Sequence, residues 1–172
     1  MAKEKKKLTN EQYKSLELIT KRGILSYPHV FEKGEYEGKE TNYNFTLAFE
    51  KQDDDLKADE GMKPFRQKLL KAKQLFWGKD PARWPKNLNT PIQDGDEEND
   101  EGKAPMPGFW LVRATSANKI PVYDNSSPPE PITEEGDIYA GCICRGFLQA
   151  AVYTISKKNN GVKFYTNGLQ KM

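Results

Sequence analysis

The sequence predicts a mainly β protein in which five strands form a small closed or partly open barrel. Apolar and polar residues alternate in five separate segments, while helical spacing dominates one long segment between them. The length of 172 residues, of which 36% are hydrophobic, is enough for one domain with a real core. We therefore expect a single domain over residues 22–172, with a helical insertion, preceded by a Lys-rich tail and a short helix over residues 1–21.

The N-terminal residues carry a helix start signal. Thr9 is the expected N-cap, and Gln12 completes a capping box three residues later. Leu16 and Ile19 continue one apolar face, so we predict a short helix over about 10–20. A first strand follows over about 22–31, in which Pro28 indicates an edge strand or a bulge.

The middle of the chain alternates between strand and helix patterns. In the second predicted strand, 42–50, the row Tyr43, Phe45, Leu47 and Phe49 is expected to face the core. A helix over about 59–77 shares one apolar face among Met62, Phe65, Leu69, Ala72 and Phe76. An irregular acidic loop over about 78–108 precedes the third strand, 109–117.

The stretch from Asp137 onward predicts a long β-hairpin. After Asp137 it contains no Asp or Glu, and two different sets of residues alternate along 138–154. Asn and Gly within 157–161 tolerate positive φ, so we expect a turn there and a fifth strand over 162–169. The hairpin then presents Arg145, Phe147, Lys163 and Tyr165 on its surface.

Five strands around one intervening helix favour the oligonucleotide-binding (OB) barrel over a sandwich. The usual helix of that fold lies between the third and fourth strands. Here the helix is expected after the second strand, which is a departure from the usual order.

Charge is segregated along the chain, although the formal net charge is only +2. Residues 63–86 carry eight Lys or Arg against one acidic residue, and residues 138–172 carry five against none. Acidic residues gather in 53–60, 94–101 and 130–137. Such segregation produces a basic footprint on a nearly neutral protein, because charges further apart than about 10 Å are screened. The alternative is that the basic and the acidic residues alike serve only to solvate the surface.

Several function classes are disfavoured. The single histidine, His29, and the two cysteines, Cys142 and Cys144, cannot make a four-ligand zinc site in one chain. The acidic cluster 94–100 lacks the spacing of a calcium loop and is interpreted as a turn in a solvated loop. No phosphate-binding or dinucleotide-binding pattern is present. We expect no metal, no cofactor, no membrane span and no enzymatic activity. Two cysteines that point to one face of a strand without bridging suit a reducing compartment.

Arg and aromatic residues interleaved on an acid-free sheet are typical of a surface that binds single-stranded nucleic acid with little sequence preference. Cations neutralise phosphates, and flat rings stack on bases. Tyr43 and Trp110 have an alternative interpretation as core residues. The predicted DNA path is lined by Arg22, Tyr43, Trp110, Arg113, Lys119, Tyr123, Arg145, Phe147, Lys163 and Tyr165.

Several segments resemble a known family. LSYPHVF at 25–31, PIQDGDEE at 91–98, IYAGCICRGF from Ile138, the turn NNGV and the ending NGLQKM are similar to tailed-bacteriophage single-stranded DNA-binding proteins. The similarity runs from about residue 22 to Met172 in the same order. The sequence departs from the family pattern at Ile24, where relatives often carry a basic residue. We therefore consider Arg22 instead as the basic DNA contact in this region. The sequence ends at Met172 without the acidic tail that replicative single-strand binders commonly use to recruit partners.

The resemblance implies an OB barrel that coats single-stranded DNA during phage replication or recombination in the cytoplasm of the infected bacterium. Replication or recombination proteins are the implied protein partners, and the chain would act as a monomer or homodimer. Two alternatives remain: a protein-interaction or recombination-accessory module without strong DNA binding, and a nuclease subunit.

Overall fold

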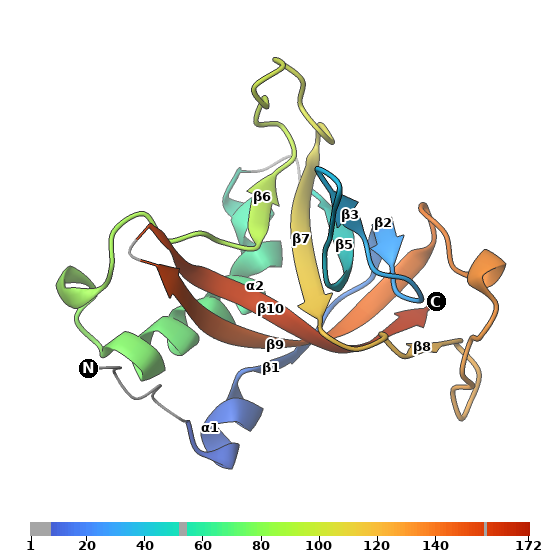
Figure 1. The fold of residues 1–172 in the computed structure, drawn as a ribbon, viewed down its shortest axis with the longest axis horizontal. Helices are drawn as coiled ribbons and strands as arrows, with labels where there is room; N and C mark the ends of the chain where they lie inside the picture. Colours follow the sequence, from blue (N-terminus) through green and yellow to red (C-terminus); the bar gives the residue numbers. More distant parts are fainter. Residues whose placement is uncertain (1–7, 52–54, 157) are drawn as a thin grey trace.

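The structure is a computed structural model that describes residues 8–51, 55–156 and 158–172, with backbone alone for 55–60. It is mainly β, with one long helix, as the sequence predicts (Figure 1). The helices are α1 (Asn10–Ser15) and α2 (Asp55–Trp77), with 3-10 turns at Pro81–Arg83 and Glu135–Asp137. The strands are β1 (Glu17–Ile19), β2 (Gly23–His29), β3 (Glu35–Tyr36), β4 (Lys39–Glu40), β5 (Tyr43–Glu50), β6 (Ile92–Asp94), β7 (Phe109–Ser116), β8 (Val122–Tyr123), β9 (Ile143–Ser156) and β10 (Asn159–Lys171).

The five longest strands follow one another in a ring. The main sheet has the order β1-β9-β2-β5-β7-β10-β8, and β9 also pairs with β10, so the path β2-β5-β7-β10-β9 returns to β2. All pairs in the ring are antiparallel except β7 with β10, where Ala114 lies beside Phe164. Each of these strands lies in one of the five predicted segments, although β9 and β10 run beyond the predicted ends.

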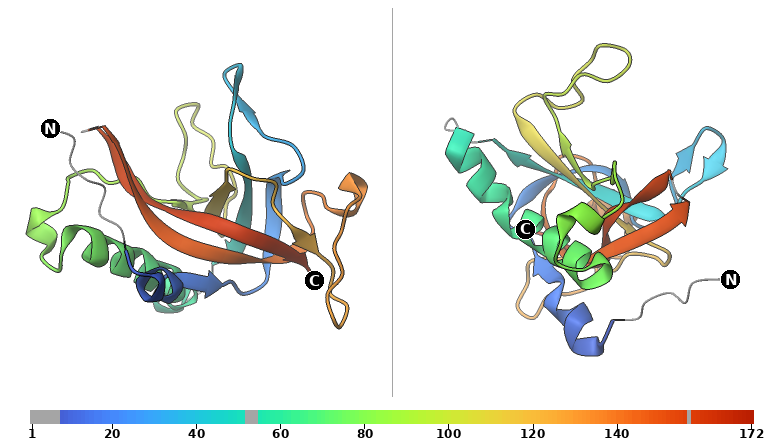
Figure 2. Two further views of the ribbon diagram at one scale, coloured as in Figure 1. Left: turned by 60° about the horizontal axis from the view of Figure 1, so that its bottom comes forward. Right: turned by 90° about the vertical axis from the view of Figure 1, so that its left-hand side faces the viewer.

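The core fills the ring and is covered by α2. The alternating residues Phe45, Leu47 and Phe49 of β5 are at most 2% exposed, as predicted from their spacing. Helix α2 packs against β9 and β10 (Figure 2), and its Phe65 ring lies 5.1 Å from Phe49 and 6.1 Å from Phe164 between centroids. The predicted apolar face of the helix is buried at its first four positions, and Phe76 is half-buried.

The N-terminal helix is shorter than predicted. Its capping box between Thr9 and Gln12 is present, but the helix ends at Ser15. The next residues form β1, in which Ile19 pairs with Phe147 of β9. A helix of this length is marginal by itself, and the open edge of β9 offers the backbone a ladder of hydrogen bonds instead. The prediction that the helix continues past Ser15 through Leu16 and Ile19 was therefore wrong.

Short strands and the final turn also differ from the prediction. The segments β3, β4, β6 and β8 have two or three residues each, too few to show an alternating pattern. Strand β10 begins at Asn159, and none of Asn159, Asn160 and Gly161 has the positive φ expected of them. Gly161 instead pairs closely with the backbone of Asn89. Lys157, which belongs to the predicted turn, lies outside the described residues.

Candidate nucleic-acid interface

The outward face of β5 and β7 forms the floor of a cavity of about 540 Å³. Asn44 and Thr46 of β5 and Arg113 of β7 line this floor, since they alternate with the core residues of their strands. Asn44 is 6% exposed and donates from Nδ2 to the carbonyl oxygen of Asn42 at 2.8 Å, which fixes its amide. The floor is therefore an ordered polar surface between two projecting walls.

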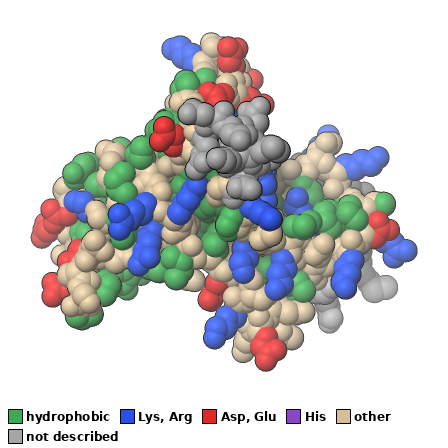
Figure 3. Space-filling model, turned by 180° about the vertical axis from the view of Figure 1, so that it is seen from behind, with side chains coloured by type: hydrophobic (Ala, Val, Ile, Leu, Met, Phe, Trp, Pro, Cys, Tyr) green, Lys and Arg blue, Asp and Glu red, His purple; other side chains and the backbone are tan. Residues whose placement is uncertain are grey.

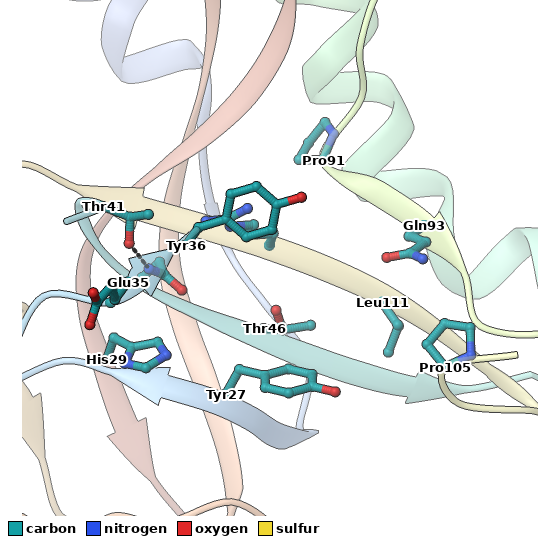
Figure 4. Close-up of a pocket in the computed structure, with 13 residues that line it drawn as sticks. Tyr27, His29, Glu35, Tyr36, Thr41, Thr46, Pro91, Gln93, Pro105 and Leu111 are labelled. Carbon is teal, nitrogen blue, oxygen red and sulfur yellow. Dashed lines mark hydrogen bonds between the residues drawn. The ribbon is translucent and has the colours of Figure 1, made fainter. Parts of the chain in front are cut away.

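The walls of the cavity come from loops on both sides of the strands. Tyr27 reaches in from β2, and Tyr36 comes from the β3–β4 hairpin, with Pro91 and Gln93 on the opposite side (Figure 4). The side chains of Tyr27 and Tyr36 are 67% and 70% exposed. The two large, exposed aromatic rings of Tyr27 and Tyr36 are available for stacking against a flat ligand.

Tyr27 owes its exposure to an irregular backbone. Its φ is +47°, which is unusual for a residue with a side chain, and the register between β2 and β5 shifts between Ser26 and His29. Pro28 follows it and cannot donate to the sheet. The bulge expected from Pro28 is thus present, and it turns the Tyr27 ring away from the core and toward the cavity.

A second cavity of about 390 Å³ continues from the first. Both cavities are lined by Pro91 and Arg113, and the second extends to Tyr153 and Lys163 near the tip of the β9–β10 hairpin. We call the two cavities together the groove. It runs from the β3–β4 hairpin across β5 and β7 to the β9–β10 tip.

Among the described residues, two cations line the groove. The guanidinium of Arg113 is exposed and has no hydrogen-bond or ion-pair partner among the described residues. The ammonium of Lys163 lies 5.3 Å from the centroid of the Tyr153 ring and 4.4 Å from that of Tyr165. Glu35 supplies the single carboxylate among the described lining residues. The groove therefore offers both positive charge and aromatic rings.

Three other predicted residues lie together on a different surface. Arg145 and Phe147 are on the outward side of β9, and Tyr123 is on β8 beside them. Arg145 donates from Nε to Oε1 of Gln170 at 2.7 Å, and Gln170 donates in turn to the carbonyl oxygen of Asp124 at 3.0 Å. We call Tyr123, Arg145 and Phe147 the outer patch. Its cation, Arg145, already has a side-chain hydrogen-bond partner, whereas Arg113 has none among the described residues.

The remaining predicted residues are dispersed. Tyr43 and Trp110 are half-buried against the core, as their alternative interpretation had it, and neither lines the groove. The Trp110 ring lies between Lys51 and Arg66, at 4.5 and 5.1 Å from its centroid. Arg22 and Lys119 are exposed in connections outside the groove. Tyr165 lies on β10 just beyond it.

The groove residues Tyr27, Tyr36 and Tyr153 were missed from the sequence. Tyr36 had a usable signal, since it is an aromatic residue in a polar connection flanked by Gly34 and Gly38. Tyr153 alternates with Arg145 and Phe147 along one strand and could have been included on that ground. Tyr27 had none, because its outward orientation depends on a positive φ.

The acidic cluster 94–100 is tied to a lysine. Asp94 and Asp96 both accept from the ammonium of Lys51, the second at 2.7 Å. That hydrogen bond is the largest cause that lowers the pKa of each carboxyl below its ordinary value of 3.8. Among the described residues, no group of three or more His, Cys, Asp or Glu stands close enough to hold a metal ion. The N–H of Glu97 donates to the carbonyl oxygen of Asp94 at 3.1 Å, so the cluster contains the predicted turn.

The two cysteines lie close together in β9 and just before it. Cys142 and Cys144 are both buried and free. Burial, with a smaller contribution from Cys142, raises the pKa of Cys144 to about 12, so its thiol stays protonated at neutral pH. In the described part of the chain, no helix is both long and apolar enough to cross a bilayer.

Comparison with known families identifies the family of this chain. The family described as the single-stranded DNA-binding protein of Enterobacter phage Enc34 matches residues 16–172. The chain belongs to this family. The match covers the ring, α2 and the groove, and it leaves out α1. The resemblance inferred from the quoted motifs is thereby confirmed.

Solved structures agree on the fold of the family. The Enc34 protein in complex with single-stranded DNA is 19% identical, with a TM-score of 0.70 over 94% of this chain and 88% of that one. The single-stranded DNA-binding protein gp2.5 of bacteriophage T7 is more distant, at 12% identity and a TM-score of 0.53 over 91% of both chains. No protein with a curated description matches the sequence.

Proposed function

We propose that the chain binds single-stranded DNA along the groove and coats it with little sequence preference. The observation that carries the proposal is a row of aromatic rings and cations along one groove of a chain from this family: Tyr36, Tyr27 and Arg113, which are exposed, and Lys163 and Tyr153, which are half-buried. Rings of this kind stack on any base, because every base has a flat face. The groups that line the groove bind and orient a strand, and we propose no chemistry on it.

The ring of strands supports an OB barrel as the finer description of the fold. In that fold, the face of the second and third strands and the loops after the first and fourth strands bind oligonucleotides. Counting along the ring in chain order, those strands are β5 and β7. The loops are the β3–β4 hairpin region and the β9–β10 tip. The groove lies on that face, between those two loops. We accordingly propose one DNA-binding domain over residues 22–172.

Binding free energy is expected to come from two sources. Each base stacked on a ring contributes about 1–3 kcal/mol, and each neutralised phosphate adds about 0.7 to the log–log salt slope. If Arg113, Lys163 and one or two loop lysines act together, the slope is about −2 to −3. Lys and Arg also spread over the face carrying α2, with Asp and Glu mostly toward its margins (Figure 3), and this supports long-range attraction of a polyanion.

The test is a comparison of a homopyrimidine strand with duplex of equal length across a salt series. We expect wild-type protein to prefer the single strand, and Tyr36→Leu to weaken binding about five-fold or more. Tyr139→Leu is the matched control, because Tyr139 is 56% exposed and lies outside the groove. Preference for duplex at every salt concentration, with no loss in Tyr36→Leu, would favour the protein-interaction module.

A role in phage DNA replication or recombination follows if the chain coats single strands. The site of action would be the cytoplasm of the infected bacterium, where replication or recombination proteins are the candidate partners. The outer patch of Tyr123, Arg145 and Phe147 remains a second candidate DNA contact, since it was predicted from the same interleaving of cations and rings.

A further inference from the structure

A second cleft lies next to the groove, between the two helices and the β9–β10 hairpin. It has a volume of about 500 Å³ and is bordered by Tyr13 of α1, Phe76 of α2 and Tyr165 of β10. Along β9 it follows residues 150–155, which extend past the three-residue strand β1 that pairs with β9. The proposed function of the groove leaves this cleft unused.

The cleft and the groove are continuous. Tyr153, Ile155 and Lys163 line both of them. The ammonium of Lys163 is within 5.3 Å of the Tyr153 ring centroid and 4.4 Å of the Tyr165 ring centroid. Lys163 thus stands where the two hollows meet, and a phosphate could pair with it while the adjoining bases lie on opposite sides.

The lining of the cleft suits unpaired bases. The side chains of Tyr13 and Tyr165 are 40% and 39% exposed, so each leaves part of its ring open. The described residues that line the cleft include Lys163 and no carboxylate. Stacking on Tyr rings beside a cation and away from fixed negative charge is the combination that favours single strands.

Helix α1 is fastened as a wall of the cleft. The carbonyl oxygen of Tyr13 accepts from Nε2 of Gln149 at 3.0 Å, and that of Ser15 accepts from Nζ of Lys68 at 2.8 Å. The wall is thus tied to both β9 and α2 before any ligand arrives, which lowers the entropy cost of binding. Because the family match begins at residue 16, this wall belongs to the part of the chain that the family does not cover.

We propose that single-stranded DNA leaving the groove crosses Lys163 and continues into the cleft, where a base stacks on Tyr13 and Tyr165. This inference rests on the proposed function and extends its path. It predicts that a strand long enough to pass the β9–β10 tip gains contacts that a short strand does not reach.

The test measures affinity by fluorescence anisotropy for oligothymidylates of about 4, 8, 12 and 16 nucleotides, the range of site sizes for one OB fold. The variants are Tyr13→Leu and, as a matched control, Tyr139→Leu, whose ring also has a lysine, Lys171, 5.1 Å from its centroid. We expect Tyr13→Leu to lower the affinity for the longest strand about five-fold more than that for the shortest. The control should not change with length.

Tyr165→Leu provides a second variant, because it leaves α1 intact and should reproduce the same dependence on length. Equal loss at every length in both variants, or no loss at the longest strand, would overturn the extended path while leaving the groove in place. If wild-type protein binds no strand of any length, the proposed function fails together with this inference.

Discussion

Arg113 and Arg145 differ in what holds their guanidinium groups. Arg113 is exposed in the groove without a partner among the described residues, whereas Arg145 donates to Gln170 at 2.7 Å. A cation that already has a hydrogen-bonded neighbour must exchange that contact for a phosphate, so its net gain on binding is smaller. Substituting each of the two residues therefore tests whether the groove or the outer patch is the path of DNA.

We expect Arg113→Ala to weaken binding to single strands and to reduce the salt slope by about 0.7, because one phosphate contact is lost. Arg145→Ala is the matched substitution on the outer patch and should have the smaller effect. Titrations of both variants across a salt series measure the difference. A larger loss in Arg145→Ala, with Arg113→Ala unchanged, would move the DNA path to the outer patch.

The sequence identified the cations that line the groove but not several of its rings. Arg113 and Lys163 could be found because strict alternation along a strand determines which side chains face outward. Tyr27 and Tyr36 could not be derived in that way, since their positions depend on a backbone bulge and on the short β3–β4 hairpin. Trp110 lies outside the groove because its strand position points inward, which agrees with its alternative interpretation as a core residue.

At the level of elements, the loop 78–108 is hydrogen-bonded to β10 on both sides of Gly161. Asn89 donates its N–H to the carbonyl oxygen of Asn160 at 2.9 Å and accepts from the N–H of Val162 at 3.0 Å. A Cβ on Gly161 would lie 2.8 Å from the backbone nitrogen of Asn89 and closer still to its carbonyl oxygen. The contact therefore requires glycine for its close approach.

We expect Gly161→Ala to lower the free energy of unfolding by about 1–3 kcal/mol, because a new methyl group must displace backbone. Gly136→Ala is the control, since a Cβ there would have no neighbour within 4 Å. Urea unfolding of both variants measures the change. An unchanged midpoint for Gly161→Ala would mean that the loop detaches without cost.

The link from Lys51 to Asp94 and Asp96 fastens the other end of the same loop. Both carboxyl groups have a lower pKa in the folded chain than the ordinary value of 3.8, with the hydrogen bond from Lys51 as the largest cause. Unfolding therefore takes up protons at acid pH. The stabilisation is complete above about pH 4 and is lost as the pH falls through the folded-state pKa values.

Lys51→Met should lower the free energy of unfolding at neutral pH only slightly, because these groups are partly exposed and solvent screens their attraction. The difference from wild type should shrink as the pH falls below 3.8. Thermal unfolding between neutral and acid pH measures it, with Lys103→Met in the same loop as control. A difference that grows toward acid pH would contradict the assignment.

At the scale of the whole molecule, the sequence predicts the ring better than its additions. Long alternating segments such as β5 and β9 each carry enough residues for the two faces of a strand to be distinguished. The pairing partners of the short strands cannot be predicted from their own few residues. Strand β1 forms because β9 has a free edge, and α1 ends where the chain reaches that edge. Registers and the joining of distant loops are properties of the folded chain, which explains why the groove emerged only with the structure.

Closure of the ring has a consequence for synthesis. Strands β2, β5 and β7 and helix α2 all precede residue 143, but the gap between β2 and β7 is filled only by β9 and β10. At about 5–20 residues per second, a ribosome needs a few seconds to add those two strands. During that time β2 keeps one unpaired edge, and β7, which is already paired with β6 at Trp110–Val112, keeps an unpaired edge at Ala114 and Thr115. The emerging chain is therefore most prone to aggregate just before its final hairpin docks. It also acquires the Tyr153–Lys163 end of the groove at that same moment, so a nascent chain cannot capture DNA there before it has folded.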